Sequence, residues 1–356
     1  MSEETETILF VPGMGAREPG EYLDKLISGI EGYCSDRGHT LESLADPDPE
    51  HEAWRRIVVT TAMGERRQYE LRELFWTDLR RNLSEEPAAR KSLLGLDLLL
   101  FWGASAKVWK AAKNSKYMMF GTLLTLLILL AWYYGVVALA LAAIGGESGL
   151  FATSVDSAWA RGLLGLADTM QGWKVWAATS ALMALLPVSA VVNVSYSTKR
   201  YLQNRDHFQQ RATARLKREI IGAAQKGGRG RTTLLAHSFG VVVAAEALAT
   251  VQPEYAKGFR FMTMGGPLEL IQACSETVEK EVKVLTQWLA DRVLREWTDF
   301  YSHADWFCTA APVAGDVHGF VSRELTSTVG WAERATGASH SLYFSDYAVI
   351  EELLGI

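Results

Sequence analysis

The sequence predicts an α/β protein in which a mostly parallel sheet carries helices on both faces and an inserted two-helix transmembrane hairpin interrupts the domain. In both outer parts of the chain, short apolar runs alternate with runs of helical periodicity, as in parallel sheets covered by helices. Two long uncharged runs lie between those parts. We therefore expect one domain built from residues 1–90 and 198–356, a juxtamembrane segment at 91–116, and the hairpin at 117–197.

The first outer part reads as strand, helix, strand and strand. An apolar run at 7–11 ends at Pro12-Gly13, and apolar residues recur at helical spacing over 22–34. The runs at 56–62 and 70–76 are the next expected strands, the first of them because it is rich in β-branched residues.

Two uncharged runs predict the hairpin. Residues 117–144 contain no charged residue, and neither do residues 175–197. Each run exceeds the roughly 20 residues needed to cross a bilayer. Pro187 lies in the second run, where a transmembrane helix tolerates it as a kink. The alternative is a pair of buried helices in a large soluble core.

Basic residues around the runs predict the orientation. The link at 145–174 holds only Arg161 and Lys174 as basic residues. Positive charge marks the cytoplasmic side, so both outer parts are expected there. Residues 92–109 suit an amphipathic helix on the cytoplasmic leaflet, or else a soluble helix that covers the domain core. The basic residues on the outer flanks are Lys107, Lys110, Lys113, Lys116, Lys199, Arg200 and Arg205.

Composition narrows the class of protein. The net charge of −5 over 356 residues gives no sign of a nucleic-acid partner. Cys34, Cys274 and Cys308 have neither metal-ligand spacing nor an even count, which favours a reducing compartment. The acidic N-terminal residues lack the basic and apolar stretch of a secretory signal. We therefore expect the soluble part to lie in the cytoplasm.

The second outer part alternates regularly between helix and strand. A Gly-rich turn at 226–230 separates the first helix from the first strand. The expected helices are 206–225, 240–250, 275–294 and 345–354, and the expected strands are 232–236, 259–264 and 296–301.

A nucleophile motif lies between a predicted strand and a predicted helix. Ala236-His237-Ser238-Phe239-Gly240 matches G-x-S-x-G with Ala in the first position. Small residues two before and two after the serine allow the sharp turn that lifts its hydroxyl out of the sheet edge. The alternative is a serine in an ordinary strand-to-helix turn.

A serine nucleophile needs an acid and a histidine, which follow it in that order in this type of fold. Asp305, after the strand at 296–301, is the expected acid, and Asp299 and Asp316 are alternatives. His340, before the last helix, is the expected base.

Three other histidines are weaker candidates for the base. His318 is the rival, and His303 is too close in sequence to the expected acid. His237, beside the serine, is expected to serve in packing or orientation.

The oxyanion of the reaction needs backbone N–H donors. Phe239, directly after the serine, is expected to supply one. Met14, in the loop after the first strand, is the expected second donor, with Gly13 next in preference. A simple glycine turn is the alternative for that loop. A phosphate-binding loop is not expected, because no Lys-Ser/Thr follows.

These residues together resemble the lipase-like and esterase-like α/β hydrolases, and most of all the group that includes inositol deacylases of lipid-anchor remodelling. The resemblance rests on ILFVPGMG, LLAHSFG, FMTMGGPL, WTDFYSHADWF and SHSLYF, and covers the soluble parts alone. It implies that Ser238, Asp305 and His340 are nucleophile, acid and base. The sequence departs from the group in Ala236, Gly266 and Asp299, and in lacking His before Gly13.

The residues thus predict a membrane-anchored serine hydrolase of carboxylic esters that needs no metal and no cofactor. The anchor favours a lipid or an acylated substrate near the bilayer. A thioesterase or protein deacylase would use the same residues. The rival class is a membrane-bound effector or scaffold that uses the domain for binding. A channel is not favoured, because the runs are almost without polar residues. The hairpin also offers a surface for a homo-oligomer.

Overall fold

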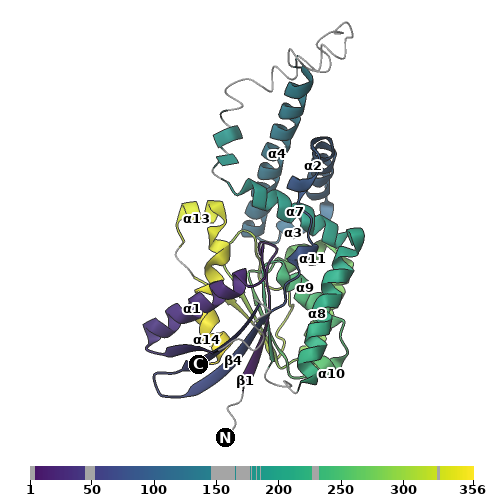
Figure 1. Ribbon diagram of the computed structural model, residues 1–356. Coiled ribbons are helices and arrows are strands. Elements are labelled where there is room, and N and C mark those ends of the chain that lie inside the picture. The colour runs from purple at the N-terminus through teal and green to yellow at the C-terminus, as the bar shows by residue number, and fades with distance from the viewer. Residues whose placement is uncertain are drawn as a thin grey trace. The chain divides into compact units, whose positions relative to one another are not determined.

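The sheet is parallel except at one edge. Among the residues that the computed structural model describes, eight strands form one sheet in the order β2-β3-β4-β1-β5-β6-β7-β8 (Figure 1). The neighbouring strands β4, β1, β5, β6, β7 and β8 pair in parallel, whereas the pairs β2–β3 and β3–β4 are antiparallel. The predicted α/β class with a mostly parallel sheet is confirmed. The strands are β1 Thr5–Val11, β2 Thr40–Leu44, β3 Trp54–Thr60, β4 Arg66–Glu73, β5 Thr232–His237, β6 Arg260–Met264, β7 Glu296–Tyr301 and β8 Phe320–Glu324.

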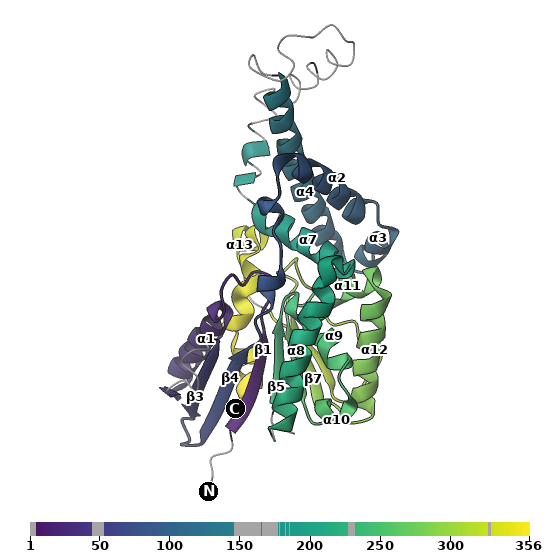
Figure 2. The ribbon, with the colours of Figure 1, turned by 45° about the vertical axis from the view of Figure 1, so that its right-hand side comes forward.

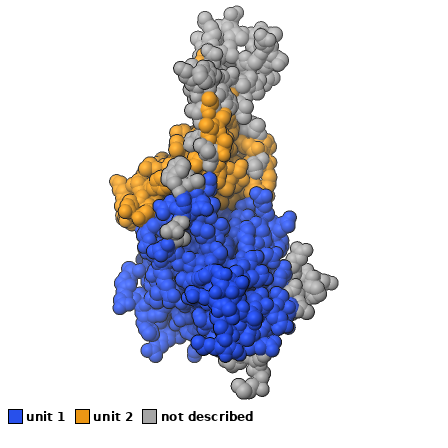
Figure 3. All heavy atoms as spheres, turned by 90° about the vertical axis from the view of Figure 1, so that its left-hand side faces the viewer, with its two compact units in different colours: residues 1–80, 204–356 blue, residues 81–203 orange. Residues whose placement is uncertain are grey.

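The chain forms two compact units, coloured separately in Figure 3. Unit 1 consists of residues 1–80 and 204–356 and contains the sheet, and unit 2 consists of residues 81–203. The structure describes residues 5–44, 53–145, 165, 177, 179–181, 183–184, 186–226, 232–326 and 329–356.

Helices cover both faces of the sheet in unit 1. Figure 2 shows α1 on one face and α8, α9 and α12 on the other. Helix α14 packs with α1, and α9 packs between β5 and the outer helices α8 and α12. The helices of unit 1 are α1 Glu21–Arg37, α8 Phe208–Gln225, α9 Gly240–Ala249, α10 Pro253–Ala256, α11 Leu268–Cys274, α12 Glu276–Ala290, α13 Trp331–Thr336 and α14 Tyr347–Leu354.

Burial explains why the central elements were readable from the sequence. Every residue of β5 is buried, because helices cover both faces of this central strand. Such a strand reads as a continuous apolar run. Helix α9 is buried from Gly240 to Leu248, which accounts for its small and apolar composition.

Three elements lacked a clear sequence signal. Strands β2 and β8 lie at the sheet edges and are mostly exposed, so they show no apolar alternation. Helix α11 has seven residues and ends at Cys274, directly before Ser275 caps α12, whereas the sequence predicted a helix only from Ser275 onward. Strands β2 and β8 thus depend on pairing with their neighbours in the sheet, and α11 is separated from α12 by the cap at Ser275.

The α-helices of unit 2 whose bounds are described are α2 Ala88–Gly103, α3 Ala106–Ala112, α4 Lys116–Gly145 and α7 Val188–Leu202. The segment Lys116–Ala138 of α4 is long and apolar enough to cross a membrane, and it is the one unbroken segment of this kind among the described residues. Helices α2 and α3 meet at a bend of 51°, and only together, as one broken span, are they long and apolar enough to cross a membrane.

The second predicted span is described only in part. Residues 175, 176, 178, 182 and 185 lie outside the described residues, as does most of the predicted link at 145–174. Helix α7 begins after Pro187 and continues through Lys199 and Arg200, both of which are buried. The second span, and with it the two-helix hairpin, stays a prediction.

Two buried carboxyl groups face one another between helices of unit 1. Glu246 on α9 and Glu281 on α12 are 7% and 8% exposed. Gln209 donates to Oε2 of Glu246 at 2.9 Å, whereas Oε2 of Glu281 is buried with no hydrogen-bond partner among the described residues. Burial and the charge of Glu246 raise the pKa of Glu281 to about 8.

This pair predicts that the stability of the domain falls as pH rises. The pKa of Glu281 is higher in the folded state than its ordinary value of 4.5, so folding favours the protonated form. Stability is lost between pH 4.5 and about 8. Glu281→Gln should therefore raise the midpoint of thermal unfolding at pH 8.5 and change it little at pH 4.5.

Glu276→Gln, at an exposed position on the same helix, is the matched control. Thermal unfolding of the full chain in detergent, followed at both pH values, measures the effect. An equal gain at pH 4.5 and 8.5, or the same gain in the control, would contradict the prediction.

Candidate active site

A sharp turn between β5 and α9 displays Ser238. The strand ends at His237, and α9 begins at Gly240. Ser238 has φ of 58°, in the left-handed region that non-glycine residues rarely adopt. Its N–H donates to the carbonyl of Met264 at 3.0 Å, and its own carbonyl accepts from Val241 at 3.0 Å. The turn is thus fixed on both sides of a residue whose backbone is strained.

Two glycines allow the turn to approach the loop after β1. A Cβ atom on Gly240 would lie 2.5 Å from the carbonyl oxygen of Pro12. A Cβ atom on Gly13 would lie 2.7 Å from Cβ of Ser238 and 3.2 Å from its Oγ. The distances of 2.5 Å and 2.7 Å are shorter than the contacts that Cβ atoms make in proteins, so these positions require glycine. The backbone of Gly13 therefore lies directly against the serine.

Three side chains from distant segments form a continuous hydrogen-bonded chain. Oγ of Ser238 lies 2.7 Å from Nε2 of His340, and Nδ1 of His340 lies 2.7 Å from Oδ2 of Asp305. His340 lies in the short 3-10 helix Ala338–Phe344, and Asp305 lies in the loop after β7. Because a carboxylate only accepts, Nδ1 donates to Asp305, which leaves Nε2 to accept from the serine hydroxyl.

The carboxylate of Asp305 is buried and has several donors. The residue is 1% exposed. Its Oδ1 accepts from the N–H of Phe307 at 3.0 Å, and its Oδ2 also accepts from the hydroxyl of Tyr343 at 3.1 Å. Burial by itself raises the pKa of Asp305, but the charge and hydrogen bond of His340, together with the bond from the N–H of Phe307, outweigh burial and lower it. Asp305 therefore stays ionised beside His340.

A buried thiol extends this group. Sγ of Cys308 lies 3.0 Å from the hydroxyl of Tyr343. Burial holds the pKa of Cys308 and of Tyr343 well above their ordinary values. Both groups are therefore neutral, and they add no second negative charge next to Asp305.

His237 is a neutral neighbour of the site. It is 1% exposed, and burial together with the nearby His340 lowers its pKa to about 3. Its Nε2 lies 2.9 Å from the carbonyl oxygen of His340, which can only accept, so Nε2 carries the proton. The rings of His237 and His340 lie 4.8 Å apart. His237 thus holds the backbone of His340 and does not contact Ser238 as a base.

The loop after β1 is held by a segment that follows β4. Met14, the expected oxyanion donor, is 1% exposed, so its side chain anchors the loop in the core. Three carbonyl groups of the loop accept hydrogen bonds from side chains of that segment. The pairs are Trp76 Nε1 to Pro12 at 2.9 Å, Thr77 Oγ1 to Ala16 at 2.8 Å, and Arg80 Nη1 to Met14.

Phe239 lies where the expected first oxyanion donor must lie, directly after Ser238 at the start of α9. The loop with Gly13 and Met14 lies against the same serine. Which of the two loop amides faces a substrate stays a prediction.

The alternative acids take no part in the hydrogen bonds that join Ser238, His340 and Asp305. Asp299 is buried within β7, where its carboxylate accepts from Thr263 at 2.7 Å, Ser322 at 2.9 Å and the N–H of Ala311 at 2.7 Å. It links three strands. Asp316 is exposed in the loop that leads into β8.

The alternative histidines also lie elsewhere. His318 is exposed just before β8, and the neighbouring Gly319 bonds Trp297 at the amino end of β7. Because the strands run parallel, His318 lies at the amino-terminal end of the strands, whereas Ser238 follows the carboxyl-terminal end of β5. His303 pairs with Glu324.

Some residues of the site had little or no signal in the sequence. Trp76, Thr77 and Arg80 are 64, 61 and 66 residues from the loop residues that they bond. Cys308 has no motif. Tyr343 stood out only through its spacing of three from His340, which in a 3-10 helix brings both side chains to one side.

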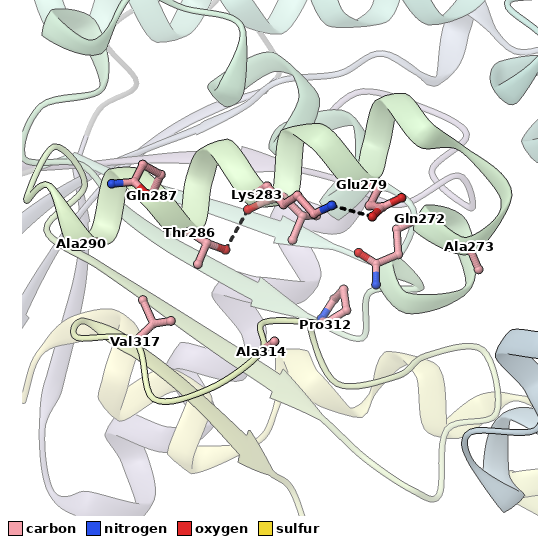
Figure 4. A pocket seen from close by; sticks show the side chains of 11 residues that line it. Gln272, Ala273, Glu279, Lys283, Thr286, Gln287, Ala290, Pro312, Ala314 and Val317 are labelled. Carbon is pink, nitrogen blue, oxygen red and sulfur yellow. Dashed lines mark hydrogen bonds and ion pairs between the residues drawn. The ribbon is translucent and has the colours of Figure 1, made fainter.

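A separate groove of about 520 Å³ lies between α11, α12 and the loop before β8 (Figure 4). Its polar side chains pair along α12, where Lys283 contacts Glu279 at 2.6 Å and Thr286 donates to Val282 at 2.8 Å. None of its lining residues belongs to the Ser238 site.

Comparisons and metal geometry add no further assignment. No protein-family model, curated protein or solved structure matches the chain. Within the described parts of the chain, no cluster of three or more His, Cys, Asp or Glu side chains is placed to hold a metal ion.

The strained backbone of Ser238 predicts an unusual order of stability between two variants. Ser238→Ala and Ser238→Gly both remove the bond to His340, but only glycine relieves the positive φ of 58°. Glycine should therefore be more stable than alanine by about 1 kcal/mol, the reverse of their order in ordinary backbone. Thermal or urea unfolding of both variants measures this difference, and an alanine variant that matches or exceeds the glycine variant would contradict it.

Proposed function

We propose that this chain is a membrane-anchored serine hydrolase of the α/β-hydrolase type that cleaves carboxylic esters. The observation that carries the proposal is the chain of two 2.7 Å hydrogen bonds from Ser238 through His340 to Asp305. A serine held at positive φ between a strand and a helix is the arrangement that exposes a nucleophile at a sheet edge. A lone serine in a turn would require neither the imidazole nor the buried carboxylate.

The proposed reaction starts with acylation of the serine. Oγ of Ser238 forms a bond to the carbonyl carbon of the ester, and its proton passes to Nε2 of His340. The carbonyl electrons move onto oxygen to give a tetrahedral oxyanion. When this collapses, the carbon–oxygen bond to the alcohol breaks, and His340 donates the proton to the leaving alcohol.

Water completes the cycle. It attacks the acyl-enzyme, and Nε2 of His340 accepts its proton. Collapse of the second tetrahedral intermediate releases the carboxylic acid and returns the proton to Ser238. Asp305 stabilises the imidazolium in both halves, and its lowered pKa supports this role because the carboxylate remains charged.

We propose the N–H groups of Phe239 and Met14 as the oxyanion donors, with Gly13 as the alternative in the loop. The contact of Gly13 with Ser238 supports a loop placed within reach of the reacting carbon. The bonds from Trp76, Thr77 and Arg80 support a preorganised loop, and preorganised donors are the ones that stabilise developing charge.

The anchor is proposed on α4 and on the second uncharged run. One described helix, Lys116–Ala138, has the length and apolarity of a span. With the basic flanks, this supports a cytoplasmic hydrolase domain and a lipid or acylated substrate. A thioesterase or protein deacylase would use the same groups, and a homo-oligomer through the hairpin stays a prediction.

A fluorophosphonate probe tests the proposed enzyme directly, because it reacts with activated serines. The full chain should be labelled, and Ser238→Ala and His340→Ala should both lose labelling. His318→Ala, which removes the rival histidine, is the matched control and should keep it. A folded wild-type chain that is not labelled would favour the rival binding module, and labelling that survives Ser238→Ala would exclude Ser238 as the nucleophile.

The hydroxyl of Tyr343 predicts a smaller effect on the same reaction. It donates to Asp305 at 3.1 Å, so Tyr343→Phe removes one hydrogen bond from a buried carboxylate. Such a bond is worth about 1.5 kcal/mol, and loss of the orientation that it gives should lower kcat about tenfold. Tyr33→Phe, whose hydroxyl bonds Glu351 at 3.4 Å, is the control. Hydrolysis of a p-nitrophenyl ester measures both, and equal rates for the two variants would contradict the prediction.

A further inference from the structure

Helix α2 presents leucines to solvent along one side. Leu93 is 73% exposed, Leu96 45% and Leu100 58%. Their spacing of three and four residues places them on one face of the helix. The opposite side of α2 is buried at Leu98 and Trp102. Exposed leucines in a row are unusual where water is the neighbour, because they leave apolar surface uncovered.

Helix α3 and its C-terminal cap carry a row of lysines. Lys107, Lys110 and Lys113 are exposed and recur every third residue. Lys116, the first residue of α4, continues the row. No acidic residue occurs between Asp97 and Glu147, so this stretch has a net charge of +4 from these four lysines.

The one acidic residue on the exposed side of α2 is neutralised. Oδ2 of Asp97 lies 2.5 Å from Nζ of Lys199, whose side chain is 6% exposed. Lys199 also donates to the backbone carbonyl of Asp97 at 2.9 Å. The pair removes a negative charge that would otherwise repel an anionic surface beside the leucines.

We propose that α2 and α3 form a docking surface for a bilayer that contains anionic phospholipids. Helix α2 packs along α4, with Gly95 against Trp132 and Tyr133 of the candidate span, so Leu93, Leu96 and Leu100 contact the acyl chains. Lys107, Lys110 and Lys113, which precede the span, contact lipid phosphates. We call these six residues the docking surface. The inference rests on the proposed anchoring through α4.

Continuity with α4 and charge complementarity argue for a bilayer as the occupant. Residues 113–115 link α3 to the first residue of the candidate span, and the four Cα–Cα steps from Ala112 to Lys116 reach at most about 14 Å. When α4 crosses the bilayer, α3 must therefore lie near the headgroups. Lysines at that depth are attracted to anionic lipids, because they lie within a Debye length of about 8 Å of the charged headgroups.

The depth of α2 is tested with a fluorophore. The full chain carries Cys274→Ser, because Cys34 and Cys308 are buried and Cys274 is partly exposed. Leu96→Cys is labelled with an environment-sensitive nitrobenzoxadiazole dye in proteoliposomes. Met63→Cys is the matched control, because Met63 is an exposed apolar residue of unit 1 at 98% exposure.

At position 96 the dye should emit at shorter wavelength than at 63 and be quenched by lipids brominated on the acyl chains. Equal emission and no quenching at 96 would overturn the proposed insertion of the leucines and favour a protein partner on α2.

Lipid selectivity tests the lysines. Spin-labelled phosphatidylglycerol and phosphatidylcholine are compared in proteoliposomes of the full chain, by the fraction of each that is motionally restricted. The wild type should prefer phosphatidylglycerol by about twofold or more, and salt should weaken the preference. Lys107→Gln with Lys110→Gln and Lys113→Gln should remove it. The control changes Lys257, Lys280 and Lys283 of unit 1 to Gln, with the same loss of charge.

Equal selectivity in the wild type and the α3 variant, or an equal loss in the control, would overturn the role of the lysines. Alkaline carbonate extraction of the wild type separates this outcome from failure of the anchor. A chain that leaves the bilayer on extraction overturns both the anchor and the docking surface. A chain that stays without lipid selectivity overturns the docking surface alone, and fluorophosphonate labelling reports the hydrolase site independently of both.

Discussion

Ser238 can meet His340 only because the chain turns through a left-handed conformation where β5 ends. The hydrogen bond between their side chains joins residues 102 positions apart, and the turn at φ of 58° points the hydroxyl toward it. An L-residue adopts this conformation at a cost of roughly 1 to 2 kcal/mol. The surrounding structure therefore has to hold it, which explains the glycines and backbone hydrogen bonds on every side of the turn.

Burial acts in opposite directions on the groups around this turn, and their partners decide the outcome. It lowers the pKa of His237 and raises the pKa of Cys308 and Tyr343, so all three are neutral. It also raises the pKa of Asp305, but His340 and the hydrogen bonds to the carboxylate reverse that effect. The site thus contains one buried negative charge next to the one partly exposed imidazole.

Unit 2 begins directly after a residue that holds the loop next to Ser238. Arg80, the last residue before unit 2, is one of the three side chains that hold the loop after β1. The segment that carries the candidate span therefore follows directly, in sequence, the segment that supports the proposed oxyanion donors.

The amino-acid sequence by itself determined the α/β class, the central strands and the candidate span, because continuous burial of β5 and the uncharged run of α4 leave local patterns of composition. It also singled out Ser238 as a candidate, since a tight turn restricts the residues beside the serine, and it singled out Asp305 and His340 by their order in the chain after that serine. Tertiary structure alone decided the exposed edge strands β2 and β8, the hold of Trp76, Thr77 and Arg80 on the loop, and the bond from Tyr343 to Asp305. These depend on contacts between distant segments, and a single hydrogen bond across 38 to 66 residues leaves no periodicity in the sequence.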